Sequence, residues 1–212
     1  MGKLVGGPFG QMSGKTGDLI GSSWKGIATV KRYQPKVANP QTAGQVAQRG
    51  KMANVVAFAQ AILAVVIKPL WDRFQSGQSG FNAFVSRNIA LFTTAMPSNY
   101  ATLVTSSGKM AATPISAAVV DVSSALLTVN WVNDAGSGFK LASDIAYVVF
   151  VNQTKGTIEG FQDGSSRGDI IVNMPIDNPV DVADVCHVYL SFLRADGTVV
   201  SVNSYTTVNA TA

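Results

Sequence analysis

Hydrophobic and polar residues alternate in short segments along the second half of the chain. Turn residues separate these segments, and Asp196-Gly197 marks the last turn clearly. The segments cover residues 115–122, 125–132, 142–152, 157–161, 169–174, 185–194 and 198–208. A hydrophobic period of two predicts strands with one buried face. Because seven short strands in about 100 residues are typical of immunoglobulin and fibronectin type III domains, we expect a β-sandwich of that kind over residues 114–212.

Between residues 41 and 96 the hydrophobic period lengthens to three or four residues, which predicts two helices. Asn39-Pro40 offers an N-cap followed by proline at the first helical position. Hydrophobic residues spread around much of the first helix, so its later turns should be buried, and Pro69 should stop or kink it. The second helix is expected from about Phe81 to Met96. The two helices should together form an α-helical hairpin.

The first part of the chain is rich in turn residues. Two alternating segments flank Lys25-Gly26 and predict a β-hairpin over residues 18–33, whose second strand is basic on both faces. Residues 1–17 carry six glycines and should form an arm that is irregular or becomes ordered only against a partner. We therefore predict an α+β chain with a glycine-rich basic arm at 1–17, the two hairpins at 18–96, a Ser-, Thr- and Pro-rich linker at 97–113 and the sandwich at 114–212.

The composition limits the chemistry that the chain can perform. Hydrophobic residues make up 47% of the 212 residues, which is enough for a core without disulfides or metal. The single cysteine, Cys186, excludes an internal disulfide, and the single histidine, His187, removes most metal sites. We expect no cofactor. No signal peptide is visible, and the longest apolar run, residues 55–67, is shorter than the roughly 20 residues that span a bilayer.

Charge divides unevenly along the chain. Up to Lys109 there are twelve lysines and arginines against two acids, a net charge of +10, whereas the remainder has four against ten, a net charge of −6. A strongly basic half can bind a polyanion such as nucleic acid or an acidic protein surface. The acidic half could supply that surface in another copy of the chain.

Most of the candidate binding residues lie in and around the predicted β-hairpin. Cations pair with phosphate or carboxylate, and aromatic rings interleaved with them can stack on bases or pack against a partner. The candidates are Trp24, Lys25, Lys31, Arg32, Tyr33, Lys36, Arg49 and Lys51. Alternatively, the cations are only solvated and the two rings anchor the hairpin on the helix.

Three short motifs suggest chemistry that their surroundings do not support. Residues 10–16 resemble a phosphate-binding loop, but the first glycine of that motif is replaced by Phe9, and no strand and helix flank the segment. Residues 164–168 match the nucleophile-elbow pattern but precede a strand, and His187 is more simply a paired strand histidine. Arg167-Gly168-Asp169 spells a cell-adhesion tripeptide, which is otherwise a solvated turn. We predict no enzymatic activity.

An ordered series of motifs resembles a known family. The series comprises Gly14-Lys15-x-Gly17, Gly21, Trp24-Lys25-Gly26, Arg32, Pro35, Asn39-Pro40-x-Thr42, Gln45, Gln48-Arg49 and Phe81-Asn82-Ala83-Phe84-Val85. It is similar to uncharacterised proteins of about this length in Bacteroidota genomes and in their phages and prophages. The resemblance covers nearly the whole chain, implies a phage context and supplies no activity.

These observations favour a non-enzymatic virion structural protein associated with the capsid, its decoration or the tail. It would be made in the host cytoplasm and would assemble with copies of itself and with other virion proteins through the basic first half, while the sandwich is displayed. The alternative is an accessory protein that binds nucleic acid through the same basic half. Adhesion through the sandwich loops is a third hypothesis and rests on fold analogy.

Overall fold

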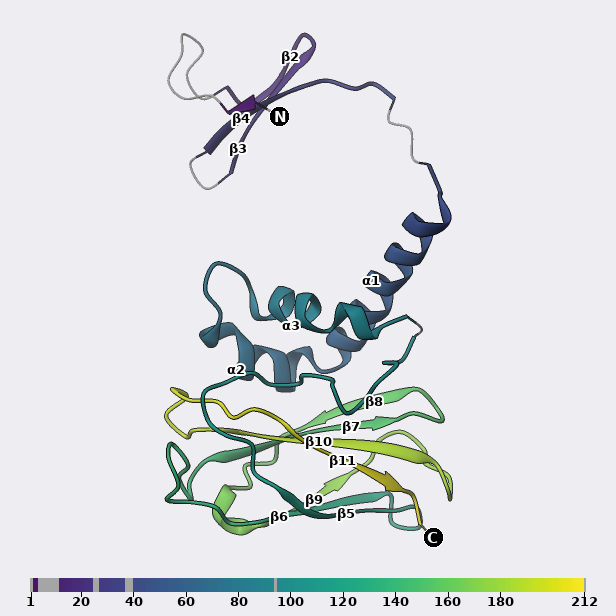
Figure 1. The fold of residues 1–212 in the computed structure, drawn as a ribbon, viewed down its shortest axis with the longest axis vertical. Coiled ribbons are helices and arrows are strands. Elements are labelled where there is room, and N and C mark those ends of the chain that lie inside the picture. The colour runs from purple at the N-terminus through teal and green to yellow at the C-terminus, as the bar shows by residue number, and fades with distance from the viewer. Residues whose placement is uncertain (1, 4–11, 25–26, 37–39, 94, 212) are drawn as a thin grey trace. The chain divides into compact units, whose positions relative to one another are not determined.

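A computed structural model describes residues 2–3, 12–24, 27–36, 40–93 and 95–211 (Figure 1). The chain forms two compact units, Met1–Thr42 and Ala43–Ala212. This boundary lies before the predicted linker at 97–113, and the helices were predicted to group with the β-hairpin. The helices instead belong to the same unit as the sandwich, because their hydrophobic residues pack on one of its sheets.

The N-terminal unit is a four-stranded antiparallel sheet in the order β1-β4-β3-β2. Its strands are β1 (Gly2–Lys3), β2 (Gly14–Thr16), β3 (Leu19–Trp24) and β4 (Ile27–Arg32). The predicted β-hairpin is confirmed as β3 paired with β4, from Leu19 opposite Arg32 to Trp24 opposite Ile27. Its turn, Lys25-Gly26, lies outside the described residues.

The predicted irregular arm is wrong at residues 2–3 and 14–16, which form strands β1 and β2. Gly14 and Gly17 have φ angles of +95° and +57°, a region that glycine enters without steric cost. Here the glycines shape the start of β2 and the turn after it, so β2 can pair with β3. The rest of the arm, residue 1 and residues 4–11, is outside the described residues.

The C-terminal unit begins with a helical layer. It consists of α1 (Ala43–Ala61), a π-helical turn (Leu63–Ile67), α2 (Lys68–Trp71), a 3-10 turn (Asp72–Phe74), α3 (Gly80–Asn88) and a second 3-10 turn (Ile89–Leu91). Proline occupies the start of α2, where its missing N–H disrupts no hydrogen bond. Ser79 caps α3 by accepting a hydrogen bond from the backbone N–H of Asn82 at 3.3 Å. The predicted helical hairpin is present, although the second helix ends several residues before Met96.

Two antiparallel sheets form the sandwich. One contains β5 (Ile115–Asp121), β6 (Leu126–Trp131) and β9 (Ile171–Pro175), with β6 in the centre. The other has the order β11-β10-β7-β8 and contains β7 (Ile145–Asn152), β8 (Thr157–Phe161), β10 (Val185–Leu193) and β11 (Ser204–Asn209). Counted from β5, the fourth strand of the sandwich is β8, and it shares a sheet with the third, sixth and seventh strands, β7, β10 and β11. Fibronectin type III domains have this arrangement, and the predicted fold class is confirmed.

Strands β7 and β10 are buried on both faces, because the C-terminal unit has three layers (Figure 1). Val148, Phe150 and Leu190 face the three-stranded sheet and belong to the core inside the sandwich. Tyr147 and Tyr189 face the other way and belong to a second core beneath the helices. The order of layers is therefore helices, four-stranded sheet, three-stranded sheet.

The predicted linker at 97–113 is wrong in its central part, which is packed into the C-terminal unit. Leu103 and Met110 are 1% exposed, and the buried Ser106 hydroxyl lies 2.8 Å from that of Ser191. A Cβ on Gly108 would lie 1.9 Å from the carbonyl oxygen of Val200, so only glycine fits there. Ser and Thr suggested a solvated linker, but their hydroxyls here satisfy buried polar groups.

The described part of the chain contains no single helix that is both long and apolar enough to cross a membrane. Only α1 taken together with the helical segment Leu63–Phe74 reaches that length and composition, and a 71° bend separates the two.

Candidate functional site

The N-terminal sheet places two lysines on one face. The pairing register puts Lys15, Ile20 and Lys31 opposite one another across β2, β3 and β4. Directly opposite residues share a face of a sheet, as do residues two positions further along each strand. Ser22 and Thr29 therefore lie on this side, with their hydroxyls 2.8 Å apart. We refer to Lys15, Ile20, Ser22, Thr29 and Lys31 as the cationic face.

Tyr33 extends the cationic face beyond the end of β4. The Lys15 ammonium lies 3.6 Å from the centre of the Tyr33 ring, within the range of a cation–π contact. The backbone N–H of Tyr33 also donates to the carbonyl of Asp18 at 2.6 Å, which holds this residue against the β2–β3 turn. Tyr33 and Lys31 are among the predicted binding residues, whereas Lys15 is not, although it stands in the Gly14-Lys15-x-Gly17 motif.

The other predicted residues are distributed more widely. Arg32 pairs with Leu19, so it lies on the opposite face of the sheet, and Lys36 is exposed after β4. Trp24 ends β3, but its side chain and all of Lys25 lie outside the described residues. Arg49 and Lys51 are on α1 in the other unit. The structure therefore unites Lys31 with Tyr33 and does not bring all eight predicted residues into one site.

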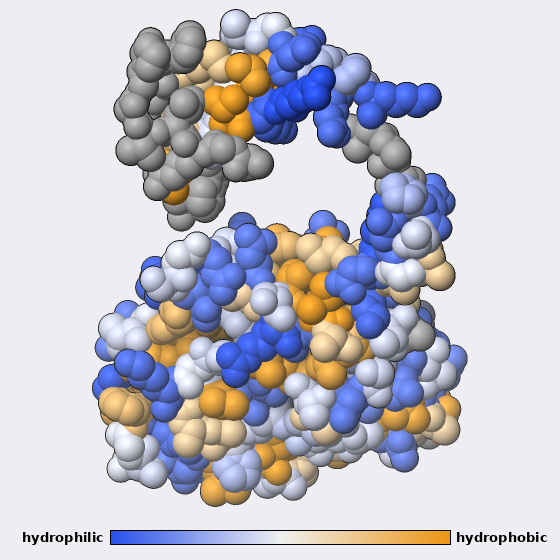
Figure 2. All heavy atoms as spheres, turned by 45° about the horizontal axis from the view of Figure 1, so that its top comes forward, coloured by the Kyte–Doolittle hydropathy of each residue, from blue (hydrophilic) through white to orange (hydrophobic). Residues whose placement is uncertain are grey.

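The N-terminal sheet lacks a hydrophobic core among its described residues. Only Gly21 and Ala28 are buried there, and neither core cluster includes a residue before Val55. Leu19 and Ile27 are 46% and 42% exposed. Figure 2 shows hydrophobic and strongly hydrophilic residues side by side on the surface of this unit. Small sheets need a buried hydrophobic face to be stable, and the described residues of this unit do not provide one.

The first turns of α1 are also left exposed by the rest of the C-terminal unit that the structure describes. Every residue from 43 to 50 is exposed, and Val46 and Met52 expose about half of their surfaces. Gly44 and Gly50 lower the helix propensity of this segment by about 1 kcal/mol each relative to alanine. A helix end with weak propensity and exposed apolar residues is suited to binding a partner.

Positive charge is uncompensated at the cationic face. Lys31, like Arg32, Lys36 and Lys51, forms no ion pair within the described ranges. All four cations after Lys109, in contrast, are paired with acids: Lys140 with Asp134, Lys155 with Asp181, Arg167 with Asp134 and Asp144, and Arg194 with Asp196. The N-terminal charges are thus available to an external acidic or phosphate-bearing partner.

Within the Arg167-Gly168-Asp169 tripeptide, the Arg167 side chain has a structural role. Arg167 is fully buried, and its guanidinium pairs with Asp144 at 3.2 Å and Asp134 at 2.5 Å. It also lies over the Phe192 ring, and its carbonyl accepts a hydrogen bond from the Trp131 indole at 2.9 Å. The interpretation as a solvated turn is wrong for Arg167, and a cell-adhesion receptor could not reach this guanidinium.

His187 is a buried strand residue. One ring nitrogen lies 3.0 Å from the Tyr205 hydroxyl and the other 2.8 Å from the side-chain oxygen of Gln153, while the Tyr100 ring stacks on it at 3.7 Å. Burial lowers the pKa of His187 to about 4. Ser166 is bonded instead to Asp169, whose carboxylate accepts from its backbone N–H and its hydroxyl at 2.7 and 2.8 Å. These contacts give both residues structural roles.

We expect stability to fall between pH 6.5 and 4 because of His187. The unfolded chain gains a proton near the ordinary histidine pKa of about 6.5, whereas the folded state does not until about pH 4. The free energy of unfolding should therefore decrease as the pH is lowered through this window, by on the order of 3 kcal/mol. Urea unfolding at several pH values measures this decrease in the free energy of unfolding. Between about pH 6.5 and 5, above the range in which carboxylates titrate, the slope should largely disappear in His187→Gln, and an unchanged slope there would contradict the assignment.

No group of three or more His, Cys, Asp and Glu side chains suited to a metal ion occurs in the part of the chain that the structure describes. Cys186 is buried, and burial raises its thiol pKa to about 11.

The chain is thus an α+β protein with a fibronectin-type sandwich, a helical layer and a separate basic sheet. Residues 11–207 match the family described as "Family of unknown function (DUF6266)", and the chain belongs to that family. No curated protein matches it.

Proposed function

We propose that this chain is a non-enzymatic structural protein that assembles through its basic N-terminal half and displays its sandwich. The observation that carries the proposal is the four-stranded sheet without a core of its own in the described residues. Such a sheet becomes stable when a partner covers it. We further propose a phage virion as the setting, in the capsid, its decoration or the tail. That part rests on the motif resemblance to proteins of Bacteroidota phages and prophages.

The partner surface should be acidic, and another copy of the chain carries one. Residues from 110 onward have a net charge of −6, whereas those before have +10. Docking the cationic face on an acidic surface would bring Lys15 and Lys31 near carboxylates and cover Ile20. Each such contact is small, but many identical contacts in an assembly add up through multivalency.

A valine at Gly21 should abolish assembly and leave the C-terminal unit folded. A Cβ at Gly21 would lie 2.1 Å from the carbonyl oxygen of Met12, a backbone atom that cannot move aside cheaply. The N-terminal sheet should therefore lose its packing, while the two cores of the other unit remain unchanged. Sedimentation velocity over a range of protein concentrations would measure assembly, and far-UV circular dichroism would check the fold.

The matched control is Ser23→Val, which adds a branched side chain to the same strand and the same face at an exposed position. It should assemble like the unmodified chain. A chain that stays monomeric at all concentrations, with and without other virion proteins, would refute the proposal.

The second candidate function is nucleic-acid binding. It is favoured by one observation, the grouping of two lysines, a tyrosine ring and two hydroxyls on one side of the sheet. Affinity for DNA or RNA should then fall steeply with salt concentration, because binding releases counterions from phosphates. Nucleic-acid binding would be excluded if no affinity for DNA or RNA were detected, or if the affinity did not depend on salt concentration.

A further inference from the structure

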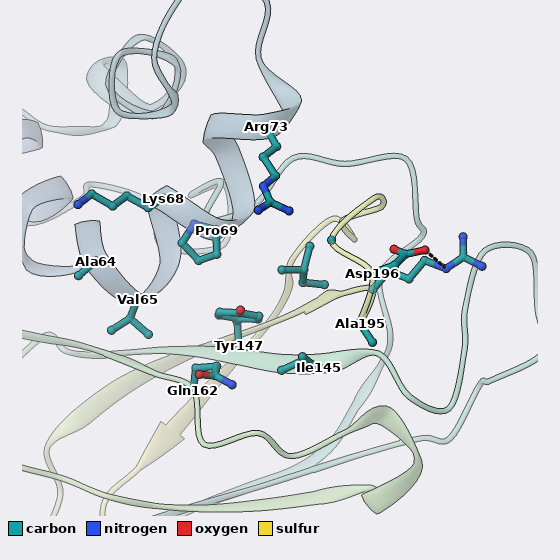
Figure 3. Close-up of a pocket in the computed structure, with 13 residues that line it drawn as sticks. Ala64, Val65, Lys68, Pro69, Arg73, Ile145, Tyr147, Gln162, Ala195 and Asp196 are labelled. Carbon is teal, nitrogen blue, oxygen red and sulfur yellow. Dashed lines mark ion pairs between the residues drawn. The ribbon is translucent and has the colours of Figure 1, made fainter.

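A cavity of about 670 Å³ lies within the C-terminal unit, between the helical layer and the four-stranded sheet (Figure 3). Ala64 and Val65 of the π-helical turn and Pro69 of α2 form one wall, and Ile145 and Tyr147 of β7 form the opposite one. The turn 194–197 closes a third side. Turns of π-helix occur frequently at functional sites, and this volume falls in the range of small-molecule sites.

Lys68, Arg73 and Tyr147 bring hydrogen-bond donors to this cavity. Arg73 points from the helical layer towards the cavity, and Tyr147 lies across from it (Figure 3). Tyr147 is 9% exposed, and its hydroxyl has no hydrogen-bond partner among the described residues. Lys68 and Arg73 form no ion pair within the same residues. Lys68 and Arg73 are exposed, so an anion that enters the cavity can reach their charges.

Among the described residues, Asp196 is the one acid that lines the cavity, and it is already engaged. The Asp196 carboxylate accepts hydrogen bonds from the backbone N–H and the hydroxyl of Thr198 at 2.9 and 2.6 Å. It also pairs with Arg194 at 3.7 Å. The excess of positive charge is notable because this unit is acidic from residue 110 onward.

We infer that this cavity binds a carboxylate carried on an apolar body. Arg73 would take the carboxylate, the Tyr147 hydroxyl would donate to it, and Lys68 would add long-range attraction. An arginine fork matches the two oxygens of a carboxylate. The apolar part of the ligand would lie against Val65, Pro69 and Ile145. This cavity lies in the C-terminal unit and the cationic face in the N-terminal unit, so either proposal can fail without the other.

Titration of the full chain with benzoate tests the inference, read by the methyl NMR signals of Val65 and Ile145. We expect a saturable shift with a dissociation constant in the millimolar range. Benzamide has the same shape without the charge, and it should bind at least about tenfold more weakly. Arg73→Gln should weaken benzoate binding at least about tenfold, because charge-assisted hydrogen bonds are roughly twice as strong as neutral ones. Arg87→Gln, which changes an exposed arginine of α3 outside the cavity, is the control and should have no effect.

Equal affinity for benzoate and benzamide, unchanged binding in Arg73→Gln, or no saturable shift would each overturn the inference. The natural carboxylate could be a free organic acid or a side chain of another copy, and sedimentation separates these two sources. If benzoate and Arg73→Gln both reduce self-association, the carboxylate belongs to another copy. If assembly is unchanged while benzoate binds, the ligand is a free acid.

Discussion

Replacing Arg167 by methionine should destabilise the C-terminal unit by about 3–5 kcal/mol, the usual cost of removing one partner of a buried ion pair. The variant leaves the Asp144 carboxylate, which is 0% exposed, without its counter-ion. One Asp144 oxygen already has no hydrogen-bond partner within the described residues, so the remaining charge would be poorly solvated. Asp134 would retain Lys140 and is therefore less affected.

Urea unfolding followed by tryptophan fluorescence measures this effect, since the Trp131 indole donates to the Arg167 carbonyl. The control is Arg194→Met, because Arg194 is partly exposed and its pair with Asp196 is long at 3.7 Å. Exposed pairs contribute about 0–1 kcal/mol. Adding Asp144→Asn to Arg167→Met should recover part of the loss by removing the unpaired charge. Equal losses for Arg167→Met and Arg194→Met would contradict a buried network.

Reversing two charges on the cationic face should weaken assembly by on the order of 100-fold. The double variant Lys15→Glu with Lys31→Glu places like charges against the acidic surface expected of the partner, and such contacts cost several kcal/mol. It also removes the contact between the Lys15 ammonium and the Tyr33 ring. Sedimentation velocity at fixed salt concentration gives the change in association constant.

A control with the same change in net charge keeps this result interpretable. Arg87→Glu with Lys109→Glu alters two exposed cations of the C-terminal unit, outside the cationic face. This control should assemble within about a fewfold of the unmodified chain. Similar losses for both pairs would show that only total charge matters, which would argue against a defined docking face.

Periodicity predicted the sandwich because its signal is local. In β7 and β10, apolar residues alternate with polar ones or follow one another without interruption over eight or more residues. Such patterns identify a strand without knowledge of the strands that it pairs with. Trp131 of β6 is 3% exposed and packs edge-on against Phe192 of the facing sheet, so its ring belongs to the core between the two sheets.

The features that sequence could not predict depend on contacts between distant residues. The sequence around Arg167 is typical of a polar turn, and its ion pairs with Asp134 and Asp144 form only in the folded chain. Ser106 lies in the segment predicted to be a linker, but its hydroxyl is within hydrogen-bond distance of the hydroxyl of Ser191, 85 positions away. Similarly, Lys15 was passed over because the pairing of β2 with β3 could not be inferred from a glycine-rich segment.

Hydrogen exchange of the full chain at several protein concentrations tests the central claim most directly. If a partner stabilises the N-terminal sheet, amides of β3 and β4 should exchange rapidly in dilute protein and become protected as assembly proceeds. Amides of β7 and β10 should be protected equally at all concentrations, because their two cores lie within one unit. Full protection of β3 and β4 in dilute monomer would show that the sheet is stable alone and would contradict the proposed role.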